Sequence, residues 1–305
     1  MKNPRLCVVG ACNIDLTAYV PRMPAWGETL RGTRFRMGFG GKGANQAVMA
    51  AKLGARVAMV AKLGRDAFGQ NTLRNFERFG VNTQHVHFTD EAFSGVALIT
   101  VDPDGRNAIV VVTGANDLLT PADVEAARDV IAASSALICQ WEVPLDSTLA
   151  ALRLARAAGV RTIFNPAPAC AELPEEACQL TDILCPNESE TALLTGVPVG
   201  SVEQAEAAAQ ILRERGVGAV VVTRGENGSL VVDEDGVEPI PAERVKAVDS
   251  TGAGDAFVGS LAYFLGVGLG LREAARRAGA IATRSVLKPG TQTSFPSAEE
   301  MASLR

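Results

Sequence analysis

Short apolar runs alternate with longer amphipathic stretches along most of the chain. The run RLCVVGA at 5–11 predicts a buried strand, and GANQAVMAAKLGA at 43–55 predicts a helix that Gly54 ends. A strand over 56–64 and a helix over 66–80 continue this order. Because strands and helices follow each other in turn, the pattern predicts an α/β fold, with a mainly parallel sheet and helices on both of its faces.

The same alternation returns in the second half of the chain. ALICQWE at 136–142 predicts a strand, and a helix opens after it at Pro144, a residue well suited to a first turn. Three further apolar segments, RTIFNP, DILCPN and AVVVTRG, predict further strands, with two helices before the last of them. The second half therefore extends the parallel sheet.

Two stretches, 16–39 and 94–114, break this rhythm. The first alternates polar and apolar residues without a helical period, and the second predicts a hairpin that turns at DPDG. We interpret them as one small inserted β-sheet that serves as a lid or a subunit contact, in preference to two separate hairpins. The predicted organisation is then an α/β domain over 1–15, 40–93 and 115–305, with an inserted β lid over 16–39 and 94–114.

Composition excludes several classes of protein. The 305 residues carry a net charge of −5 and no basic stretch, which argues against a nucleic-acid partner. No apolar run reaches the roughly 18 residues that a membrane span needs, so no membrane association is expected. The first residues lack the pattern of a signal peptide, and we expect a cytoplasmic protein.

Cysteine and histidine are too sparse to suggest a metal centre. None of the cysteines forms a C-x-x-C pair, and we expect small buried hydrophobes rather than disulfides or zinc ligands. The only histidines, His85 and His87, are expected on one face of a strand, where a metal pair would lack a further histidine. This scarcity also argues against a Ser-His-Asp hydrolase. The six cysteines are Cys7, Cys12, Cys139, Cys170, Cys178 and Cys185.

A glycine-rich segment, MGFGGKGANQA at 37–47, contains a G-x-G-x-x-G pattern. A dinucleotide site needs a buried strand before that pattern, whereas GTRFRM here predicts a half-exposed strand, so an NAD dehydrogenase is excluded. A Walker A loop is excluded because Gly43 follows Lys42 in place of Ser or Thr. Two interpretations remain: backbone that approaches a ligand, with Lys42 and Asn45 as donors, or a tight turn with Lys42 in solvent.

A second glycine segment, VDSTGAGDAFVGSLAYFL at 248–265, predicts a loop that becomes a helix. Gly252, Ala253 and Gly254 leave room for an anion to approach the free N–H groups of the helix start. Asp255 follows them, and a carboxylate beside an anion site suits phosphoryl transfer to a hydroxyl. From the residues alone, a catalytic Asp255 and an Asp255 that only caps the helix remain equal alternatives.

Together, the two segments resemble the signatures of the ribokinase (PfkB-type) carbohydrate kinase family, over 38–69 and 249–265. The resemblance continues in order through CNID, CQWEVP, FNPAPA, CPNESE, TRGENG and PGTQTSFPS, and so covers nearly the whole chain. It implies a Rossmann-like α/β domain with a small β-sheet lid, often clasped in a homodimer. The two inserted stretches fit this expectation.

The resemblance also implies an activity. It suggests ATP-dependent phosphorylation of D-ribose at O5 to D-ribose 5-phosphate, with Mg2+ and with K+ as a monovalent activator. The alternatives are a 2-deoxyribose kinase, another sugar or nucleoside kinase of the family, and a sugar-binding regulator without catalysis. Few aromatic residues in the lid argue against a purine, and the intact GAGD and NESE motifs argue against a pure binder.

Individual roles follow from the matching positions of the family motifs. Asp255 matches the catalytic base, with Gly252, Ala253 and Gly254 as its anion hole. The bulky Trp141 stands where an aliphatic residue is common, and Gly279 where relatives often have a polar one. The matching sugar contacts are Asn13, Asp15, Gly41, Lys42, Asn45, Glu142 and Asp255. The matching nucleotide and magnesium positions are Asn187, Glu190, Thr223, Gly225, Gly228, Gly254 and Gly279. The matching monovalent-cation positions are Asp249, Thr251, Ser285, Lys288, Gly290 and Ser294.

Overall fold

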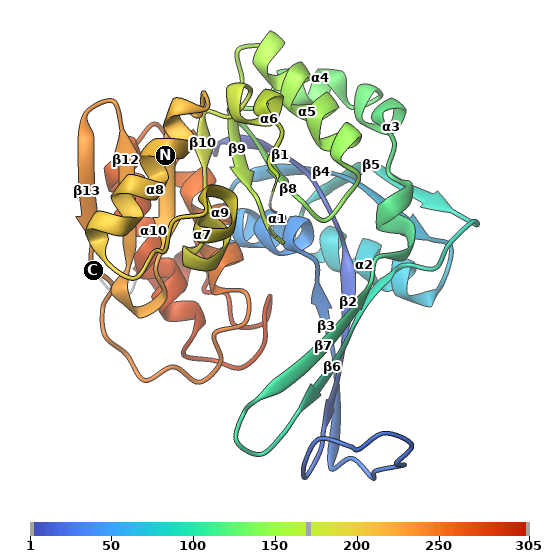
Figure 1. Cartoon of the computed structure of the whole chain (residues 1–305). Coiled ribbons are helices and arrows are strands. Elements are labelled where there is room, and N and C mark those ends of the chain that lie inside the picture. The colour runs from blue at the N-terminus through green and yellow to red at the C-terminus, as the bar shows by residue number, and fades with distance from the viewer. Residues whose placement is uncertain (1–2, 169–171, 303–305) are drawn as a thin grey trace.

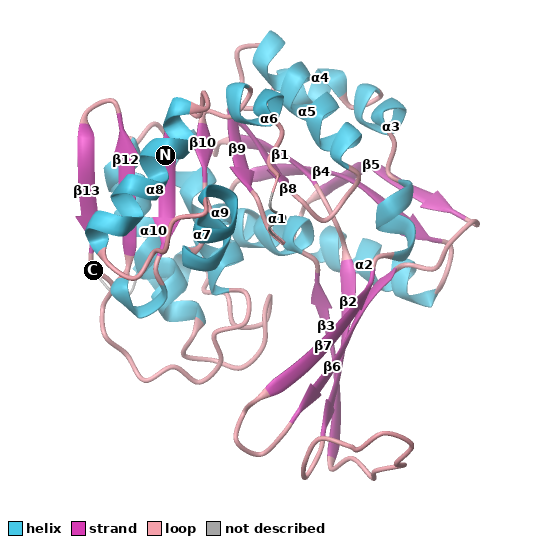
Figure 2. Cartoon of the chain, in the orientation of Figure 1, coloured by secondary structure: helices cyan, strands magenta, loops and turns pink. Residues whose placement is uncertain are grey.

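The computed structural model describes residues 3–168 and 172–302, and a large sheet organises most of them (Figures 1 and 2). Its strand order is β13-β12-β11-β10-β9-β8-β1-β4-β5. Neighbours from β5 to β11 run parallel, and β12 pairs antiparallel with both β11 and β13. The strands are β1 Arg5–Val9, β4 Arg56–Gly64, β5 Asn82–Thr89, β8 Ala136–Gln140, β9 Arg161–Asn165, β10 Ile183–Leu184, β11 Ala219–Thr223, β12 Ser229–Asp233 and β13 Gly236–Ile240.

Helices cover both faces of this sheet, as the sequence predicts. Within β1, Cys7 and Val9 pack toward one layer of helices, and Leu6 and Val8 pack toward the other. Both faces are therefore buried, which explains the unbroken apolar runs. One layer holds α1 Lys42–Lys52, α2 Ala67–Arg78, α9 Ala253–Gly266 and α10 Leu271–Ser285; the other holds α3 Pro121–Glu125, α4 Arg128–Ala132, α5 Leu145–Ala157, α6 Glu175–Gln179, α7 Glu188–Thr195 and α8 Val202–Glu214. A short α11, Ala298–Ala302, lies near the C-terminus.

The two inserted stretches form one small sheet that projects away from the α/β body (Figure 1). Its order is β3-β2-β6-β7, and only the pair β2 and β6 is parallel. The strands are β2 Asn13–Tyr19, β3 Arg34–Gly40, β6 Gly95–Val101 and β7 Asn107–Val112. The sheet begins at Asn13, before the inserted stretch expected from 16, because Asn13, Ile14 and Asp15 already pair with both neighbouring strands.

The remaining expectations concern thiols, histidines and membrane spans. All the cysteines that the structure describes are free and buried, and Cys170 lies outside the described residues. His85 and His87 share one face of β5, with ring centroids 6.4 Å apart. Over residues 3–168 and 172–302, none of the helices combines the length and the apolar character that crossing a membrane requires.

Candidate active site

The start of α9 forms an open helix N-terminus. Gly252 precedes the helix with a φ of 79°, and a Cβ at this position would lie 2.5 Å from Thr291 Cγ2. A Cβ on Gly254 would instead meet no heavy atom of the described chain within 4 Å. Within the described chain, the N–H groups of Gly254 and Asp255 have no backbone acceptor. This helix start therefore presents free donors and open space, which suit an anion.

The start of α1 is held against the segment that links β1 to β2. Gly41 has a φ of 85°, and a Cβ there would lie 2.7 Å from the backbone oxygen of Ala11. A Cβ on Gly43 would lie 2.8 Å from Gly10 Cα. The close approach is to the chain's own backbone, because α1 packs directly on the end of β1. That these glycines also bring backbone close to a ligand stays a prediction.

Asp255 lies between the two helix starts. Its side chain is 8% exposed, and each carboxylate oxygen accepts a hydrogen bond from α1: Oδ2 from Asn45 Nδ2 at 2.8 Å, and Oδ1 from Gln46 Nε2 at 3.0 Å. No N–H group of α9 donates to this carboxylate in the described structure. The capping alternative is therefore wrong, because the side chain points away from its own helix toward α1.

Lys42 lies among several carboxylates. Burial alone would lower the pKa of Lys42, but Asp255, Glu142 and Glu190 outweigh burial and raise it. Burial raises the pKa of Glu142, although Lys42 opposes this shift. Glu142 Oε2 also accepts a hydrogen bond from the backbone N–H of Lys42 at 2.8 Å, so it holds the α1 start as well. The charges of these acids thus favour the protonated form of the partly buried Lys42.

Two polar side chains enter the site from β2. Asn13 is 6% exposed, and its Oδ1 accepts a hydrogen bond from Asn116 Nδ2 at 2.8 Å. A Cβ on Gly40 would lie 2.2 Å from Asp15 Oδ1, so the adjacent strand leaves space for this carboxylate. Burial and the charge of Asp255 raise the pKa of Asp15 to about 6, while Arg36 opposes the shift. Both side chains therefore lie where the small sheet joins the α/β body.

Asn187 and Glu190 form the capping box of α7. Asn187 Oδ1 accepts from the backbone N–H of Glu190 at 2.8 Å, and Glu190 Oε2 accepts from the backbone N–H of Asn187 at 2.8 Å. Burial raises the pKa of Glu190, against the backbone bond from Asn187 and the charge of Lys42. The box fixes both side chains at the cavity and leaves Glu190 Oε1 available to a ligand.

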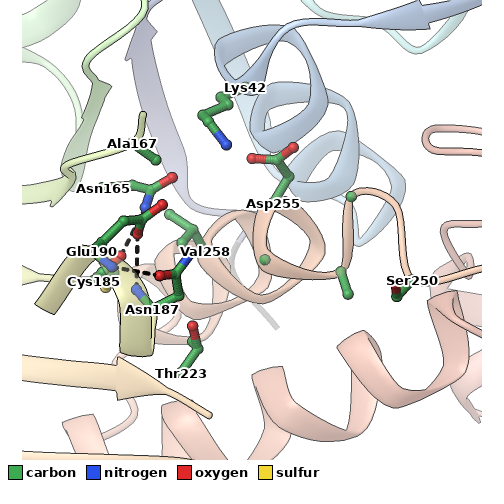
Figure 3. A pocket seen from close by; sticks show the side chains of 13 residues that line it. Lys42, Asn165, Ala167, Cys185, Asn187, Glu190, Thr223, Ser250, Asp255 and Val258 are labelled. Carbon is green, nitrogen blue, oxygen red and sulfur yellow. Dashed lines mark hydrogen bonds between the residues drawn. The ribbon is translucent and has the colours of Figure 1, made fainter. Parts of the chain in front are cut away.

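These elements surround a cavity of about 180 Å³ (Figure 3). Lys42 and Asp255 lie at one end of the view, with Asn187 and Glu190 across from them and Thr223 beyond. The cavity lies at the carboxyl ends of the parallel strands, where ligands bind in open α/β sheets. Its lining consists of Lys42, Asn165, Ala167, Cys185, Asn187, Glu190, Thr223, Ser250, Gly252, Ala253, Gly254, Asp255 and Val258.

The sequence of this chain is similar to those of known proteins over nearly its whole length. The pfkB family carbohydrate kinase model matches residues 3–298. The chain belongs to this family. It is 45% identical to the ribokinase of Mus musculus over 293 residues, which cover 95% of this chain and 91% of that protein. It is 40% identical to the deoxyribokinase of Salmonella typhi over 295 residues, covering 97% and 96% of the two chains.

Solved structures of the family share the fold over the whole length. The structure of Arabidopsis thaliana ribokinase complexed with ribose and ATP has a TM-score of 0.91 and 30% sequence identity, and the match covers 99% of each chain. The ribokinase-like α/β fold with a separate small sheet is therefore confirmed.

The positions expected to hold a monovalent cation lie on two loops that contact each other, except Ser285, which is the last residue of α10. Asp249 joins the loops, because Oδ1 accepts from Thr251 N at 3.0 Å and Oδ2 accepts from Gly290 N at 2.8 Å. Burial alone would raise the pKa of Asp249, but these hydrogen bonds and Arg36 lower it. Ser285 and Ser294 are buried nearby in the chain, with hydroxyls that donate to Ala282 O and Thr291 O. The Lys288 side chain instead reaches Glu300 on α11 at 2.7 Å.

The small sheet also contacts one of these loops directly. Arg36 on β3 donates to Thr293 Oγ1 at 2.7 Å and to Pro289 O at 3.4 Å. A Cβ on Gly290 would lie 2.0 Å from the Arg36 guanidinium. Arg36 therefore connects the small sheet to the loop at 287–294, a contact that no sequence pattern indicated.

The positions expected to contact the nucleotide differ in their surroundings. Thr223 lines the cavity, and its backbone N–H donates to Pro186 O at 2.9 Å. Gly225 and Gly228 flank the short turn that follows, and a Cβ on Gly228 would lie 2.0 Å from Ile240 O. Gly279 lies within α10, where an added Cβ would meet no described atom within 4 Å. Thr223 thus belongs to the cavity, whereas the three glycines lie outside its lining.

Sequence reasoning missed several polar residues of the site. Gln46 and Asn165 were quoted within motifs but received no role, although Gln46 Nε2 donates to both Asp255 and Asn165 Oδ1, the latter at 3.1 Å. Asn116 orients Asn13, as described above. The available signal was a polar residue inside an apolar segment, which predicts a buried polar group but not its partner.

Proposed function

We propose that this protein is an ATP-dependent sugar kinase that transfers the γ-phosphoryl group of ATP to O5 of D-ribose. One observation carries the proposal: the Asp255 carboxylate lies beside the open N-terminus of α9 within one cavity. Full-length similarity to ribokinases and the family match support it. The reaction produces D-ribose 5-phosphate and ADP.

In the proposed reaction, Asp255 is the general base. Its carboxylate accepts the proton of the sugar hydroxyl as the oxygen attacks phosphorus, and the bond to the ADP oxygen breaks. The N–H groups of Gly254 and Asp255, which have no backbone acceptor in the described structure, stabilise the charge on the transferred group, and Gly252 and Ala253 form the open turn before them. Lys42 lies in the same cavity and supplies a positive charge close to both reacting groups.

Magnesium fits the opposite wall of this cavity. Mg2+ prefers oxygen ligands and usually keeps several waters. Glu190 keeps one carboxylate oxygen available, and the capping box holds its side chain in place. We propose that Glu190 and Asn187 hold Mg2+ through water, and that the ion would neutralise phosphate charge when bound. Thr223, Gly225, Gly228 and Gly279 are proposed to border the rest of the nucleotide.

A monovalent cation fits the paired loops behind the start of α9. The Asp249 carboxylate joins both loops, and backbone carbonyls of such turns suit K+. We propose K+ as an activator that orders the α9 start from behind. The proposed positions are Asp249, Thr251, Ser285, Lys288, Gly290 and Ser294, with Lys288 contributing only its backbone because its side chain is paired.

The sugar is proposed to bind between β2 and the start of α1. Asn13, Asp15, Lys42, Asn45 and Glu142 supply a set of polar groups suited to a ring rich in hydroxyls. A sugar that lacks one hydroxyl leaves a buried partner unpaired, at a cost of about 1–3 kcal/mol. Because a deoxyribokinase is 40% identical to this chain, 2-deoxyribose is the second candidate substrate.

The small sheet is proposed to be both a lid and a dimer contact, with 16–39 and 94–114 closing over the sugar. Strand β7 is an edge strand, and its apolar side chains at Ile109, Val110, Val111 and Val112 are 50–60% exposed. Apolar edges of this kind invite pairing with a second copy. We propose a homodimer through this sheet. We also propose a cytoplasmic location, in keeping with the free thiols of the described residues.

One panel of assays tests this function. ADP release is measured with ribose, 2-deoxyribose, fructose, tagatose, adenosine and inosine, each with potassium and with sodium. We expect the highest kcat/KM for ribose, and we expect the product to carry its phosphate on O5 by NMR. A higher kcat/KM for 2-deoxyribose would select the second candidate. A preference for adenosine or inosine would refute a sugar kinase.

A further inference from the structure

Buried side-chain amides approach the two oxygens of Asp255 from opposite sides. On one side, Asn75 Nδ2 donates to Gln292 Oε1 at 2.8 Å, and Gln292 Nε2 donates to Asn45 Oδ1 at 3.0 Å. Asn45 Nδ2 then donates to Asp255 Oδ2 at 2.8 Å. This first relay joins α2, the loop at 287–294 and α1 to the carboxylate.

A second relay reaches the other oxygen. Gln140 Nε2, at the end of β8, donates to Gln46 Oε1 at 2.7 Å, and Gln46 Nε2 donates to Asp255 Oδ1 at 3.0 Å. The remaining N–H of Gln46 donates to Asn165. Gly10 leaves space for this relay, because a Cβ there would lie 1.9 Å from Gln140 Oε1.

The direction of both relays follows from the chemistry of Asp255. An ionised carboxylate only accepts hydrogen bonds, so Asn45 and Gln46 must each turn an N–H toward it. Their oxygens then face Gln292 and Gln140, which must donate in turn. Each amide has one orientation that satisfies its neighbours. Exchanging the oxygen and the nitrogen of any one amide would place two donors or two acceptors face to face.

The relays are buried, so their hydrogen bonds are costly to lose. Gln46 and Gln140 are fully buried, and Gln292, Asn45 and Asn75 are at most 8% exposed. Water cannot readily replace a missing partner at such positions, and an unpaired buried polar group is destabilising. The arrangement therefore restricts rotation of the Asp255 side chain about its own axis.

We propose that Gln292 and Gln46 are positioning residues for the carboxylate of Asp255, one for each of its oxygens. Gln46 acts directly and Gln292 acts through Asn45. The role in catalysis rests on the proposed function, in which Asp255 is the base, whereas the hydrogen-bond directions do not. The loop at 287–294 thus acts on the Asp255 carboxylate through the Gln292 side chain, in addition to its proposed effect on the start of α9.

A double-mutant cycle tests the direction of the first relay without substrate. Both relays donate a hydrogen bond to residue 255. Asp255→Asn replaces one of the two acceptor oxygens by an NH₂ group, so the last donor of one relay then faces another donor. The carboxylate of Gln292→Glu cannot donate a hydrogen bond to Asn45. The Asn45 amide then turns over, so that its N–H group faces residue 292 and its oxygen faces residue 255. This orientation suits the amide of Asp255→Asn, but it places two acceptors face to face when residue 255 is the native aspartate. Asn75 can still donate to the new carboxylate. We expect Gln292→Glu to lower the melting temperature in the parent and to raise it in the Asp255→Asn background, each by on the order of 2 °C.

A neutral variant separates this relay from simple charge repulsion. Gln292→Leu introduces no charge, but it frees Asn45 to turn. We therefore expect Gln292→Leu to cost less melting temperature in the Asp255→Asn background than in the parent. Thr162→Val, which removes a buried hydroxyl on β9 that donates to Leu180 O, is the matched control and should be additive with Asp255→Asn. If the effect of Gln292→Glu on the melting temperature depended on Asp255→Asn but the effect of Gln292→Leu did not, the relay would be overturned.

Kinetics test the consequence for catalysis. In the parent background, we expect Gln46→Leu and Gln292→Leu each to lower kcat about tenfold while the KM for ATP stays unchanged, because the base is misplaced and the nucleotide is untouched. Thr162→Val should keep the parental kcat. Parental kcat in both Leu variants would overturn the positioning role. If the parent itself leaves ribose unphosphorylated, the proposed function fails, whereas the melting experiment still decides the relay.

Discussion

Replacing Gly252 and Gly254 by alanine, one at a time, separates folding from anion binding at the start of α9. Gly252 has a φ of 79°, where an alanine costs about 1–2 kcal/mol. Its new Cβ would also lie 2.5 Å from Thr291 Cγ2, and overpacking of this kind costs about 1–3 kcal/mol. We therefore expect Gly252→Ala to lose about 2–5 kcal/mol of stability.

Gly254→Ala should have the opposite profile. Gly254 is not at positive φ, and its added Cβ would meet no described atom within 4 Å. Alanine is also favoured over glycine within a helix by about 0.5–1 kcal/mol. We expect unchanged or slightly higher stability. The methyl group, however, would occupy the space that a phosphoryl group needs, and we expect kcat to fall on the order of 10².

The assays are calorimetric melting and steady-state ADP release with ribose. Gly268→Ala is the matched control at the other end of α9, because Gly268 has a φ of 97° and no described atom near an added Cβ. It should show the backbone cost alone and keep the parental kcat. Thr291→Ser removes the contacted methyl and should restore part of the stability that Gly252→Ala loses. A folded Gly254→Ala enzyme with parental kcat would refute the anion site at this helix.

Four further outcomes are expected. Asp255→Asn should lower kcat about 10²–10⁴-fold, measured by single-turnover phosphorylation, with unchanged calorimetric ATP affinity; turnover within a few-fold of the parent would contradict a general base. Burial and Asp255 raise the pKa of Asp15 to about 6 from 3.8, so the folded protein holds this proton more tightly and loses stability as pH rises from about 4 to about 6. Asp15→Asn should therefore melt above the parent at pH 7, with the difference shrinking toward pH 4 in calorimetry, and an equal gap at both values would argue against the shift. Potassium should raise kcat well above sodium at matched ionic strength, and equal rates would speak against the cation site. Val111→Lys should convert a dimer into monomers by light scattering, whereas a parent that is already monomeric would disprove the dimer.

The main sheet was predictable because its strands are buried on both faces. Apolar runs such as 5–11 and 56–64 are continuous for that reason, and the glycine at 54 marks a helix end in the structure as in the sequence. The pairing of β2 with β6 was not predictable in detail. Its register joins Asn13 to Gly95 across more than eighty intervening positions, and local patterns carry no information about such partners.

The site was predictable only where local chemistry is distinctive. A glycine-rich helix start followed by Asp255 indicates an anion site, and the structure has that helix start. The orientation of the carboxylate was not predictable, because its partners come from α1 and, through Asn45, from Gln292. Lys42 was open to two interpretations, and only the folded chain shows that the charges of three acids raise its pKa.

The junction of β1 and β2 limits how this enzyme can be recombined with its relatives. Asn13 stands in register with Gly40 and Gly95, and a Cβ on Gly95 would lie 2.2 Å from Asn13 Oδ1. The side chains of Asn13 and Asp15 therefore fit only neighbouring strands that lack side chains at these points. A graft that exchanges the small sheet must carry Asn13, Asp15 and both glycines together. A crossover placed at residue 16 would divide this set and damage the proposed sugar pocket.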